Sequence, residues 1–505
     1  MQKYATMNKI FFSNRLWLFI ILIFLSVFKS SAQKEENRYV PETDPLVLEK
    51  LQQWQDLKFG LLMHWGTYSQ WGIVESWSIC PEEYGWCART RGTDPENYNN
   101  YVKEYEALKN TFNPVKFNPD KWAEAAKNAG MRYVIFTTKH HDGFCMFDTK
   151  YTDYKITDTA CPFSANPKAN IAKEIFGSFR AKGLWTGAYF SKPDWHCPYY
   201  WSPKYPPRDR NVNYEPEANP ELWQKYVDFT RGQLLELVGG DYGKLDILWL
   251  DGGWVSKKSK DEITGWYNNA LKNSKQGYLK RRVINQDIKM DELVKEIRKK
   301  QPGILVVDRA VHGINQNYLT PENRVPEKAL DYPWESCIIS GGGWSYTPNA
   351  KYMSGRQGIM LLVDIIAKGG NLLLNIAPSP EGEWQQGAYD LLEEFAGWMK
   401  VNSEAVYGTR AMAPYKENNI CMTRKGDDTV YLYYMADENE TQLPAEIVVS
   451  SVNPDKKASV TLLGNNMPLK WKPVKEGGFK ILIPKNIRRN PPAKYVWVFK
   501  IKTAG

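Results

Sequence analysis

Several side chains that could do chemistry directly follow short apolar runs of the sequence. These groups are His64-Trp65-Gly66, Lys139-His140-His141-Asp142-Gly143, Tyr189 to Ser191, Asp251, Asp308-Arg309 and Trp334-Glu335. They include three of the five histidines. If the apolar runs are parallel strands of a barrel, the groups that follow them meet at one edge, where barrel enzymes place their reacting residues.

Each of these residues by itself also has a structural explanation. Asp251 could be a turn residue or a helix cap, and His64 could be a hydrogen-bonded core histidine. Arg309 could pair with Asp308 or Glu322, and Trp249 could be a packing residue. A structural explanation would have to bring all of them to one rim independently, so we expect a site there.

Two reaction classes would use such a rim. A metallohydrolase needs several ligands around one ion, but His140 and His141 would point in opposite directions if both lay on a strand, and the sequence contains no His-x-His. A glycosidase needs two carboxyl groups and side chains that bind hydroxyl groups. The 20 Trp and 30 Tyr suit stacking on sugar rings, although aromatic side chains also fill cores. We therefore predict a glycosidase without a metal ion or other cofactor.

The elements that must position these residues repeat along the chain. From about Leu57 to Ala377, short apolar runs alternate with amphipathic stretches, which is the pattern of βα units. The expected strands are 59–63, 133–136, 184–189, 247–250, 304–307 and 372–374, and the expected helices are 118–130, 171–182, 221–238, 291–300, 355–368 and 386–401. No Gly-x-Gly-x-x-Gly follows a strand, which weakens a nucleotide-binding alternative. The pattern predicts an α/β fold, a (β/α)8-like TIM barrel in which units can be irregular or missing.

The composition changes near Thr409. Runs rich in β-forming residues at 429–434, 446–449, 458–463, 479–483 and 495–501 are separated by Gly, Pro, Asn and Asp. This pattern of β-forming runs and turn residues predicts a C-terminal β-sandwich. We therefore divide the chain into a signal peptide (1–32), a (β/α)8-like catalytic domain (33–408) and a β-sandwich domain (409–505).

The N-terminus predicts export. A basic start precedes an apolar run at 16–25 and then Ser30-Ser31-Ala32, where small residues suit a signal peptidase. The run is shorter than the ~20 residues of a membrane span, so an uncleaved anchor is the weaker alternative, and we expect no later span. No Cys follows Ala32, which leaves a lipid anchor unsupported. We expect a periplasmic or secreted protein after cleavage near Ala32.

Charge and cysteine usage exclude further classes. Removal of the four cations of the signal segment (Lys3, Lys9, Arg15 and Lys29) lowers the formal charge from +9 to +5, too little to indicate nucleic-acid binding. Export permits disulfides, and Cys80 with Cys87 is the best candidate pair among seven cysteines. Structural zinc is not expected, because no paired Cys-x-x-Cys occurs.

Five motifs together resemble the α-L-fucosidase glycoside hydrolases (glycoside hydrolase family 29). They are Lys58 to Ser69 around His64-Trp65-Gly66, Lys139 to Phe144, Trp249-Leu250-Asp251-Gly252, Gly370 to Ile376 and Trp398 to Thr409. The similarity covers nearly all of the mature chain, with the motifs in the same order. It implies a retaining exo-glycosidase that hydrolyses terminal α-L-fucosyl residues of oligosaccharides or glycoconjugates, with Asp251 as the nucleophile that forms a covalent glycosyl-enzyme.

The acid/base residue has two candidates. Glu322 lies in a Thr-Pro-Glu segment 13 residues after Arg309, a spacing that resembles one branch of the family. Glu335, at an expected strand end, is the second candidate. Glu335 could instead have a structural role as a buried carboxylate that holds neighbouring barrel loops. We favour Glu322, because a loop position lets the acid/base reach over the leaving group.

The resemblance also implies roles for the other rim residues. Hydroxyl groups of the sugar would be bound by His64, Glu75, His140, His141 and Tyr189, its apolar face would be lined by Trp77, Trp249 and Trp344, and Arg309 would keep a carboxylate ionised. The segment from Cys80 to Asn100 departs from the typical opening loop and puts linkage preference in doubt. An α-galactoside is the nearest alternative substrate, and a non-catalytic carbohydrate-binding barrel is the alternative of a different class.

Overall fold

The computed structural model describes residues 39–274, 279, 281–475 and 477–502. Its larger sheet contains seven parallel strands: β1 (Phe59–Met63), β2 (Tyr133–Lys139), β3 (Trp185–Ser191), β4 (Ile247–Asp251), β5 (Leu305–Asp308), β6 (Glu335–Ile339) and β7 (Asn371–Asn375). The strands follow the order β5-β4-β3-β2-β1-β7-β6. Almost every strand residue is buried, which explains why these strands read as continuous apolar runs rather than alternating ones. The expected barrel-like α/β fold is confirmed.

An irregular segment occupies the gap between β5 and β6. Gln316 forms an antiparallel bridge with Val307 of β5, and Leu319 and Glu322 form parallel bridges with Trp334 and Cys337. Backbone hydrogen bonds join the segment to both sides, from Asn317 N to Val306 O (2.9 Å) and from Cys337 N to Pro321 O (3.1 Å). Pro321 cannot donate to a ladder, so this eighth position is not a regular strand. The irregular unit that the sequence allowed for is therefore here, and it carries Glu322.

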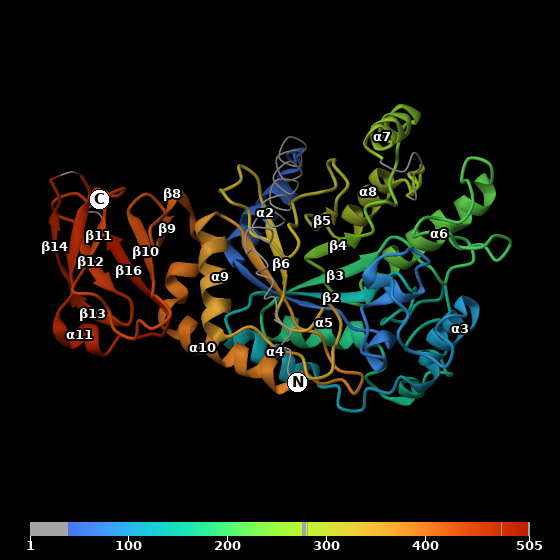
Figure 1. Cartoon of the computed structure of the whole chain (residues 1–505), viewed down its shortest axis with the longest axis horizontal. Helices are drawn as coiled ribbons and strands as arrows, with labels where there is room; N and C mark the ends of the chain where they lie inside the picture. The colour runs from blue at the N-terminus through green and yellow to red at the C-terminus, as the bar shows by residue number, and fades with distance from the viewer. Residues whose placement is uncertain (1–38, 275–278, 280, 476, 503–505) are drawn as a thin grey trace, which may run out of the picture.

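Helices cover the outer face of the sheet and one end of it (Figure 1). They are α2 (Pro45–Leu57), α3 (Tyr98–Ala107), α4 (Pro119–Asn128), α5 (Ile171–Ala181), α6 (Pro220–Leu237), α7 (Lys260–Asn273), α8 (Met290–Lys300), α9 (Gly355–Ala367) and α10 (Gln386–Val406). Short 3-10 helices lie at η1 (Thr67–Gln70), η2 (Ser76–Ile79), η3 (Gly85–Cys87), η4 (Leu108–Thr111) and η5 (Pro162–Ala165). The sequence predicted α4 from its cap: the Asn118 side chain accepts from Lys121 N, and Pro119 starts the helix. It did not predict α2, α3 or α7.

Helix α2 closes the end of the barrel where the strands begin. Its Val47, Leu51 and Trp54 share one buried cluster with side chains of the barrel interior. The Trp54 ring stacks on Tyr318 at 3.9 Å, and Asn371 Nδ2 at the start of β7 donates to Trp54 O (2.9 Å). Only the opposite end, where the strands finish, is therefore left for a site.

One strand assignment was wrong. We expected Trp334-Glu335 to follow a strand, but Glu335 is the first residue of β6 and pairs in register with Asn371, the first residue of β7. The apolar residues that define β6 come after Glu335 rather than before it. Glu335 therefore lies at the starting end of the strands, in the barrel interior.

The C-terminal region contains two antiparallel sheets, with the strand orders β13-β12-β16-β10-β9-β8 and β11-β15-β14. Its elements are β8 (Arg410–Glu417), β9 (Ile420–Lys425), β10 (Thr429–Met435), β11 (Glu446–Val449), β12 (Ser459–Leu462), β13 (Asn465–Pro468), β14 (Lys470–Pro473), β15 (Phe479–Leu482), α11 (Lys485–Arg489) and β16 (Val496–Lys502). A separate apolar cluster joins the two sheets. Figure 1 shows α9 and α10 between these strands and the barrel, and Trp398 Nε1 of α10 donates to Val496 O (2.9 Å).

Two further expectations concern membranes and cysteines. Between Tyr39 and Lys502, no described helix is both long and apolar enough to cross a membrane. The predicted signal peptide lies outside the described residues. All seven cysteines are buried free thiols, so the expected Cys80–Cys87 disulfide is not formed, although each thiol affects the pKa of the other.

Candidate active site

All eleven predicted site residues line one cavity of about 680 Å³ at the end of the barrel where the strands finish. They are His64, Glu75, Trp77, His140, His141, Tyr189, Trp249, Asp251, Arg309, Glu322 and Trp344. They come from segments up to 280 residues apart, and the parallel sheet brings them together because its strands end at the same edge. Glu335 does not line this cavity.

Asp251 ends β4 and is held by three groups. The Tyr189 hydroxyl donates to its Oδ2 (2.7 Å), and Gly252 N donates to its Oδ1 (2.8 Å). Arg309 Nη1 lies 3.4 Å from Oδ1. Burial opposes ionisation, but Arg309, His141 and the Tyr189 hydroxyl outweigh it and lower the pKa of Asp251 below its usual range. The carboxylate is therefore ionised and fixed in place, as a nucleophile must be.

The turn after Asp251 requires glycine. Gly252 has a φ of 87°, which L side chains rarely adopt, and a Cβ there would meet Pro193 Cδ at 2.2 Å. A Cβ at Gly253 would meet Arg309 O at 2.7 Å. The chain can thus turn away sharply after β4 and leave the Asp251 carboxylate at the edge of the cavity.

Arg309 connects the two carboxylates of the site. It follows β5 and contacts Asp251 with one terminal nitrogen and Glu322 with the other. Trp344 Nε1 also donates to Glu322 Oε1 (3.2 Å). The Glu322 side chain is 43% exposed against 18% for Asp251, so Glu322 lies at the mouth and Asp251 deeper. This arrangement suits one carboxyl that attacks and another that reaches the leaving group.

Glu335 lies beneath the cavity floor. It is fully buried, and its oxygens accept from the Tyr133 hydroxyl (2.5 Å) and from Trp249 Nε1 (3.3 Å). Burial, only partly offset by these hydrogen bonds and one from Tyr318, raises the pKa of Glu335 to about 8. It therefore holds the ring of Trp249 in place from below. Its contacts are with interior side chains, not with the loops that the structural alternative named.

The cavity histidines His64, His140 and His141 are neutral. Burial lowers the pKa of His64 and of His141 to about 4 and places that of His140 well below its usual value. His64 Nδ1 pairs with Asn375 Oδ1 (2.9 Å), and His140 Nδ1 pairs with Ser76 Oγ (2.5 Å). A neutral imidazole has one donor and one acceptor nitrogen, so these rings can bind sugar hydroxyl groups.

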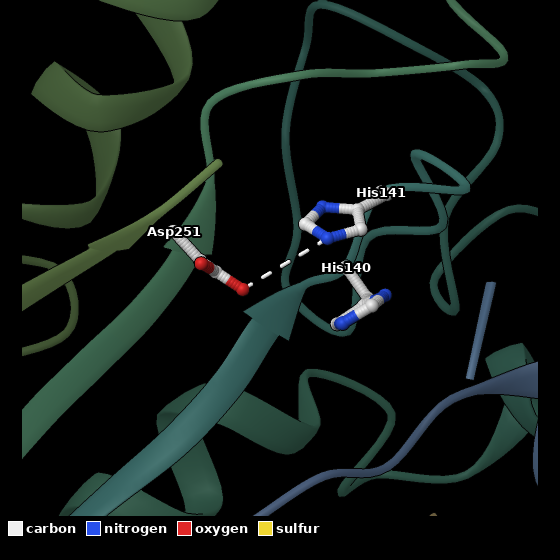
Figure 2. A group of neighbouring side chains, drawn as sticks. All are labelled: His140, His141 and Asp251. Carbon is white, nitrogen blue, oxygen red and sulfur yellow. Dashed lines mark ion pairs between the residues drawn. The ribbon is translucent and has the colours of Figure 1, made fainter. Parts of the chain in front are cut away.

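The condition under which His140 and His141 would point apart, that both lie on a strand, is not met. Strand β2 ends at Lys139, so both histidines lie in the following loop, and their ring centroids are 4.2 Å apart (Figure 2). With Asp251 they form a group whose ligand atoms all lie within 4.8 Å of one another. Asp251 is already bound by Tyr189, Gly252 and Arg309, and the guanidinium would repel a metal cation. We assign no metal to this group.

Glu75 provides a third carboxyl group on the cavity wall. It is 2% exposed, and no described group forms a hydrogen bond with its Oε1. Burial and the negative charges of Glu322 and Asp251 raise the pKa of Glu75 to about 8, against the effect of two backbone N–H groups. A protonated carboxyl group can both donate and accept, which fits the hydroxyl-binding role predicted for it.

Aromatic rings form the remaining wall. Trp249 stacks on Tyr189 with centroids 5.2 Å apart, and Trp344 lies 5.3 Å from the ring of His64. Trp77 meets His141 edge to face at 5.2 Å. Flat apolar faces with polar edges suit the C–H face of a sugar ring.

The structure adds cavity residues that the sequence reasoning missed. Arg210, Trp254, Lys258, Trp266 and Arg281 also line the cavity, and all of them lie in loops or in α7. Only Trp254, three residues after Asp251, could have been found by proximity to a motif.

The unusual segment from Cys80 to Asn100 reaches the cavity indirectly. Its Glu82 carboxylate accepts from Arg210 Nε (2.8 Å), and the Arg210 guanidinium lies 4.7 Å over the Trp77 ring. This segment therefore fixes one side of the cavity without contributing the lining group itself.

Comparison with known proteins identifies the family. The family model described as alpha-L-fucosidase matches residues 26–404, and the model of the alpha-L-fucosidase C-terminal domain matches residues 415–502. The chain belongs to the α-L-fucosidase family. It is therefore a glycoside hydrolase, as the motifs around His64, His140 and Asp251 predicted.

Relatives of this family match along most of their length. An α-L-fucosidase of Branchiostoma floridae is 26% identical over 95% of this chain and 99% of its own. The structure of α-L-fucosidase isoenzyme 1 from Paenibacillus thiaminolyticus is 29% identical, with a TM-score of 0.70 over 91% of this chain and 100% of that one. A Bacteroides thetaiotaomicron α-L-fucosidase, trapped as a covalent intermediate with 2-fluoro-fucosyl fluoride, is 22% identical with a TM-score of 0.67 over 92% and 97%. The last similarity shows the fold alone.

Proposed function

We propose that the chain hydrolyses terminal α-L-fucosyl residues of oligosaccharides or glycoconjugates with retention of configuration. The observation that carries this proposal is that one guanidinium, Arg309, contacts both an ionised deep carboxylate, Asp251, and a carboxylate at the mouth, Glu322. Carboxyl groups of a retaining glycosidase lie only ~5–5.5 Å apart, because one of them attacks directly and no water needs to fit between it and the sugar. Two carboxylates that contact one guanidinium lie near each other, which supports a retaining mechanism.

In the first step, a carboxylate oxygen of Asp251 attacks the anomeric carbon while the bond to the leaving oxygen breaks, and the protonated form of Glu322 transfers its proton to the leaving oxygen. In the second step, Glu322 takes a proton from water, the water oxygen bonds to the anomeric carbon, and Asp251 leaves as a carboxylate. The Tyr189 hydroxyl, Gly252 N and Arg309 hold Asp251 in one orientation throughout, so little reorganisation is required during attack.

The cavity supports an exo-acting enzyme. Its deep part is closed by the barrel interior, where Trp249, held from below by Glu335, forms the floor, so a sugar chain can enter only from the mouth. Neutral His64, His140 and His141, with Tyr189 and protonated Glu75, offer donors and acceptors for hydroxyl groups. Trp77, Trp249 and Trp344 offer apolar faces for the C5 methyl side of a fucosyl ring, a feature that a galactosyl ring replaces with a polar group.

The substrate is tested by comparing an aryl α-L-fucoside with the matching α-D-galactoside. We expect hydrolysis of the fucoside, and an Asp251→Ala variant that retains less than about a thousandth of the parent activity. An Asp120→Ala variant, at an exposed position in α4, serves as the control and should match the parent. Preference for the galactoside would support the alternative substrate, and tight sugar binding without turnover would support a carbohydrate-binding barrel.

The acid/base residue is tested separately with azide. On a fucoside with an activated leaving group, azide should restore turnover of Glu322→Ala and form the fucosyl azide, because the azide anion attacks the glycosyl-enzyme in place of water and needs no general base. Glu335→Ala should not respond, since Glu335 does not reach the cavity. Rescue of Glu335→Ala alone would reverse the assignment.

We also propose that residues 1–32 direct export and are removed near Ala32, which would place the enzyme in the periplasm or outside the cell. The basic start, the short apolar run and the small residues at the expected cleavage site support this proposal. Intact-mass measurement of the protein from fractionated cells tests it. A full-length mass in the cytoplasmic fraction would contradict it.

A further inference from the structure

The cavity extends beyond the residues assigned to the fucosyl unit. Its outer wall contains Lys258, Trp266 and Arg281, which come from the loop after β4, from α7 and from the segment after α7. Arg281 is exposed and the other two are half-buried, whereas His64 and His140 deep in the same cavity are buried. The wall therefore lies at the mouth, through which the leaving group of a fucoside would extend.

Helix α7 holds an aromatic side chain that core packing does not explain. The helix starts with a capping box between Ser259 and Glu262, and none of its residues is buried. Figure 1 shows it projecting from the barrel rim beyond β4 and β5. Trp266 is the α7 residue that lines the cavity, and its ring also meets Tyr267 at 5.0 Å, so an indole that could contact a sugar lies at the cavity surface.

The charges of this wall are not all balanced. Arg210 donates to the Glu82 carboxylate (2.8 Å), and Arg282 donates to the Asp209 carboxylate (2.8 Å). By contrast, no carboxylate of the described residues forms an ion pair with Lys258 or Arg281. The Lys258 ammonium donates to Ser256 Oγ (2.9 Å), a neutral partner. Two cations at the mouth are thus left to interact with a ligand.

The position of Lys258 strengthens this point. Its backbone N donates to Asn285 Oδ1 (3.0 Å), which ties the loop after β4 to the segment that carries Arg281. Burial lowers the pKa of Lys258, Glu262 opposes this, and the positive charges of Lys192 and Arg281 lower it further. A bound anion would relieve both the desolvation and the repulsion between the cations.

We propose that this wall binds a sulfate ester or carboxylate on the sugar to which the fucosyl residue is attached. Trp266 stacks on that sugar, and Lys258 and Arg281 bind its anionic group. The inference rests on the proposed function and deepens it, because it names anionic fucosylated glycans as the preferred substrate class.

The test compares four substrates: α-L-fucosyl fluoride, which has no second sugar, a neutral fucosyl disaccharide, and the same disaccharide with a sulfate ester or with a uronic acid carboxylate. We expect kcat/KM to be about tenfold higher for at least one anionic disaccharide than for the neutral one at low salt, with the preference shrinking as salt rises. The sulfate and carboxylate arms distinguish the two sources of charge.

Matched variants locate the effect. Lys258→Gln and Arg281→Gln should each lower the ratio of anionic to neutral kcat/KM several-fold, and Trp266→Ala should raise KM for the disaccharides. Lys257→Gln removes a neighbouring exposed charge that does not line this cavity, and the ratio should stay at the parent value. Equal kcat/KM for the neutral and both anionic disaccharides overturns the inference, as does an equal fall of the ratio in the Lys257 control.

The outcome for fucosyl fluoride separates the two proposals. If the fluoride is hydrolysed but kcat/KM is equal for the neutral and anionic disaccharides, the proposed function is supported and the inference is overturned. If the fluoride is not hydrolysed, the proposed function fails, and calorimetric binding of the same disaccharides decides the inference. Tighter binding of an anionic disaccharide then supports it, and equal binding overturns it.

Discussion

Replacement of Arg309 by glutamine tests how the nucleophile is kept ionised. Arg309 Nη1 lies 3.4 Å from Asp251 Oδ1, and both side chains are 18% exposed. At this distance an effective dielectric constant near ~20 gives about 5 kcal/mol of attraction. Partial solvent access reduces this to roughly 2–3 kcal/mol, which corresponds to about two pKa units at ~1.4 kcal/mol each.

The direction of the change follows from the parent site. There, burial disfavours the carboxylate, but Arg309, His141 and Tyr189 lower the pKa of Asp251 below its usual range. Without the guanidinium the pKa rises, so the acidic limb of the kcat/KM profile moves to higher pH. The lowered pKa of Asp251 also stabilises the folded protein. This contribution is fully present above the pKa of Asp in the unfolded chain, near ~3.9, and is lost as the pH falls through the pKa of Asp251 in the folded protein. The variant should lack this contribution.

The assay is the pH profile of kcat/KM on an aryl α-L-fucoside, with thermal melts to establish that the variant is folded. Arg410→Gln is the control, because Arg410 pairs with Asp56 at a half-exposed site far from the cavity. Its profile should overlay the parent. A folded Arg309→Gln enzyme whose acidic limb stays in place would refute the claim that Arg309 controls the ionisation of Asp251.

Three further predictions concern the framework of the site. Gly252→Ala should destabilise the fold by about 1–3 kcal/mol and remove most activity, because Gly252 has a positive φ and a Cβ there would meet Pro193. The control Gly177→Ala, in open space on α5, should stabilise the fold by ~0.5–1 kcal/mol. Chemical denaturation measures both variants, and equal effects would contradict the turn argument. In the parent, Glu335 ionises above ~4.3 in the unfolded state but only near pH 8 in the folded state, so the melting temperature should fall between pH 5 and 8. Glu335→Gln should make this fall smaller. An unchanged dependence of the melting temperature on pH would count against a protonated Glu335. Lys139→Met should lower the free energy of unfolding by about 3–5 kcal/mol, because it leaves the buried Asp194 carboxylate without a counter-charge. The control Lys155→Met breaks a more exposed pair with Asp148 and should change the free energy of unfolding by about 1 kcal/mol or less. Equal losses in denaturant titrations would argue against the buried pair.

Much of the framework was predictable because it depends on local pattern. Buried parallel strands need continuous apolar runs, and amphipathic helices need caps and stripes, so β1, β4 and α4 were placed within a residue or two of their ends. The nucleophile position followed from the same logic, since Asp251 comes at the end of β4. Helix α7 was not predicted, although Ile263, Trp266, Tyr267, Ala270 and Leu271 recur at helical spacing; none of its residues is buried.

The errors arose where a residue's surroundings are set by distant parts of the chain. Glu335 was placed at the wrong end of its strand because the apolar residues that define β6, Cys337, Ile338 and Ile339, come after it rather than before it. His140 and His141 would point apart only if both lay on a strand, and β2, expected at 133–136, runs on to Lys139 and ends there. In both cases the sequence pattern was correct and the boundary was not.

The sequence by itself determined the α/β barrel, the β-rich C-terminal region and the group of residues that could carry glycosidase chemistry, because periodicity and motifs are local properties. Only the tertiary structure decided how the two carboxylates relate. The irregular segment between β5 and β6 brings Glu322 to the guanidinium that also holds Asp251, while β6 places Glu335 beneath the floor. No local pattern encodes that difference, because both the ionisation of a carboxyl group and its access to a substrate depend on charges and packing contributed by segments far away in the sequence.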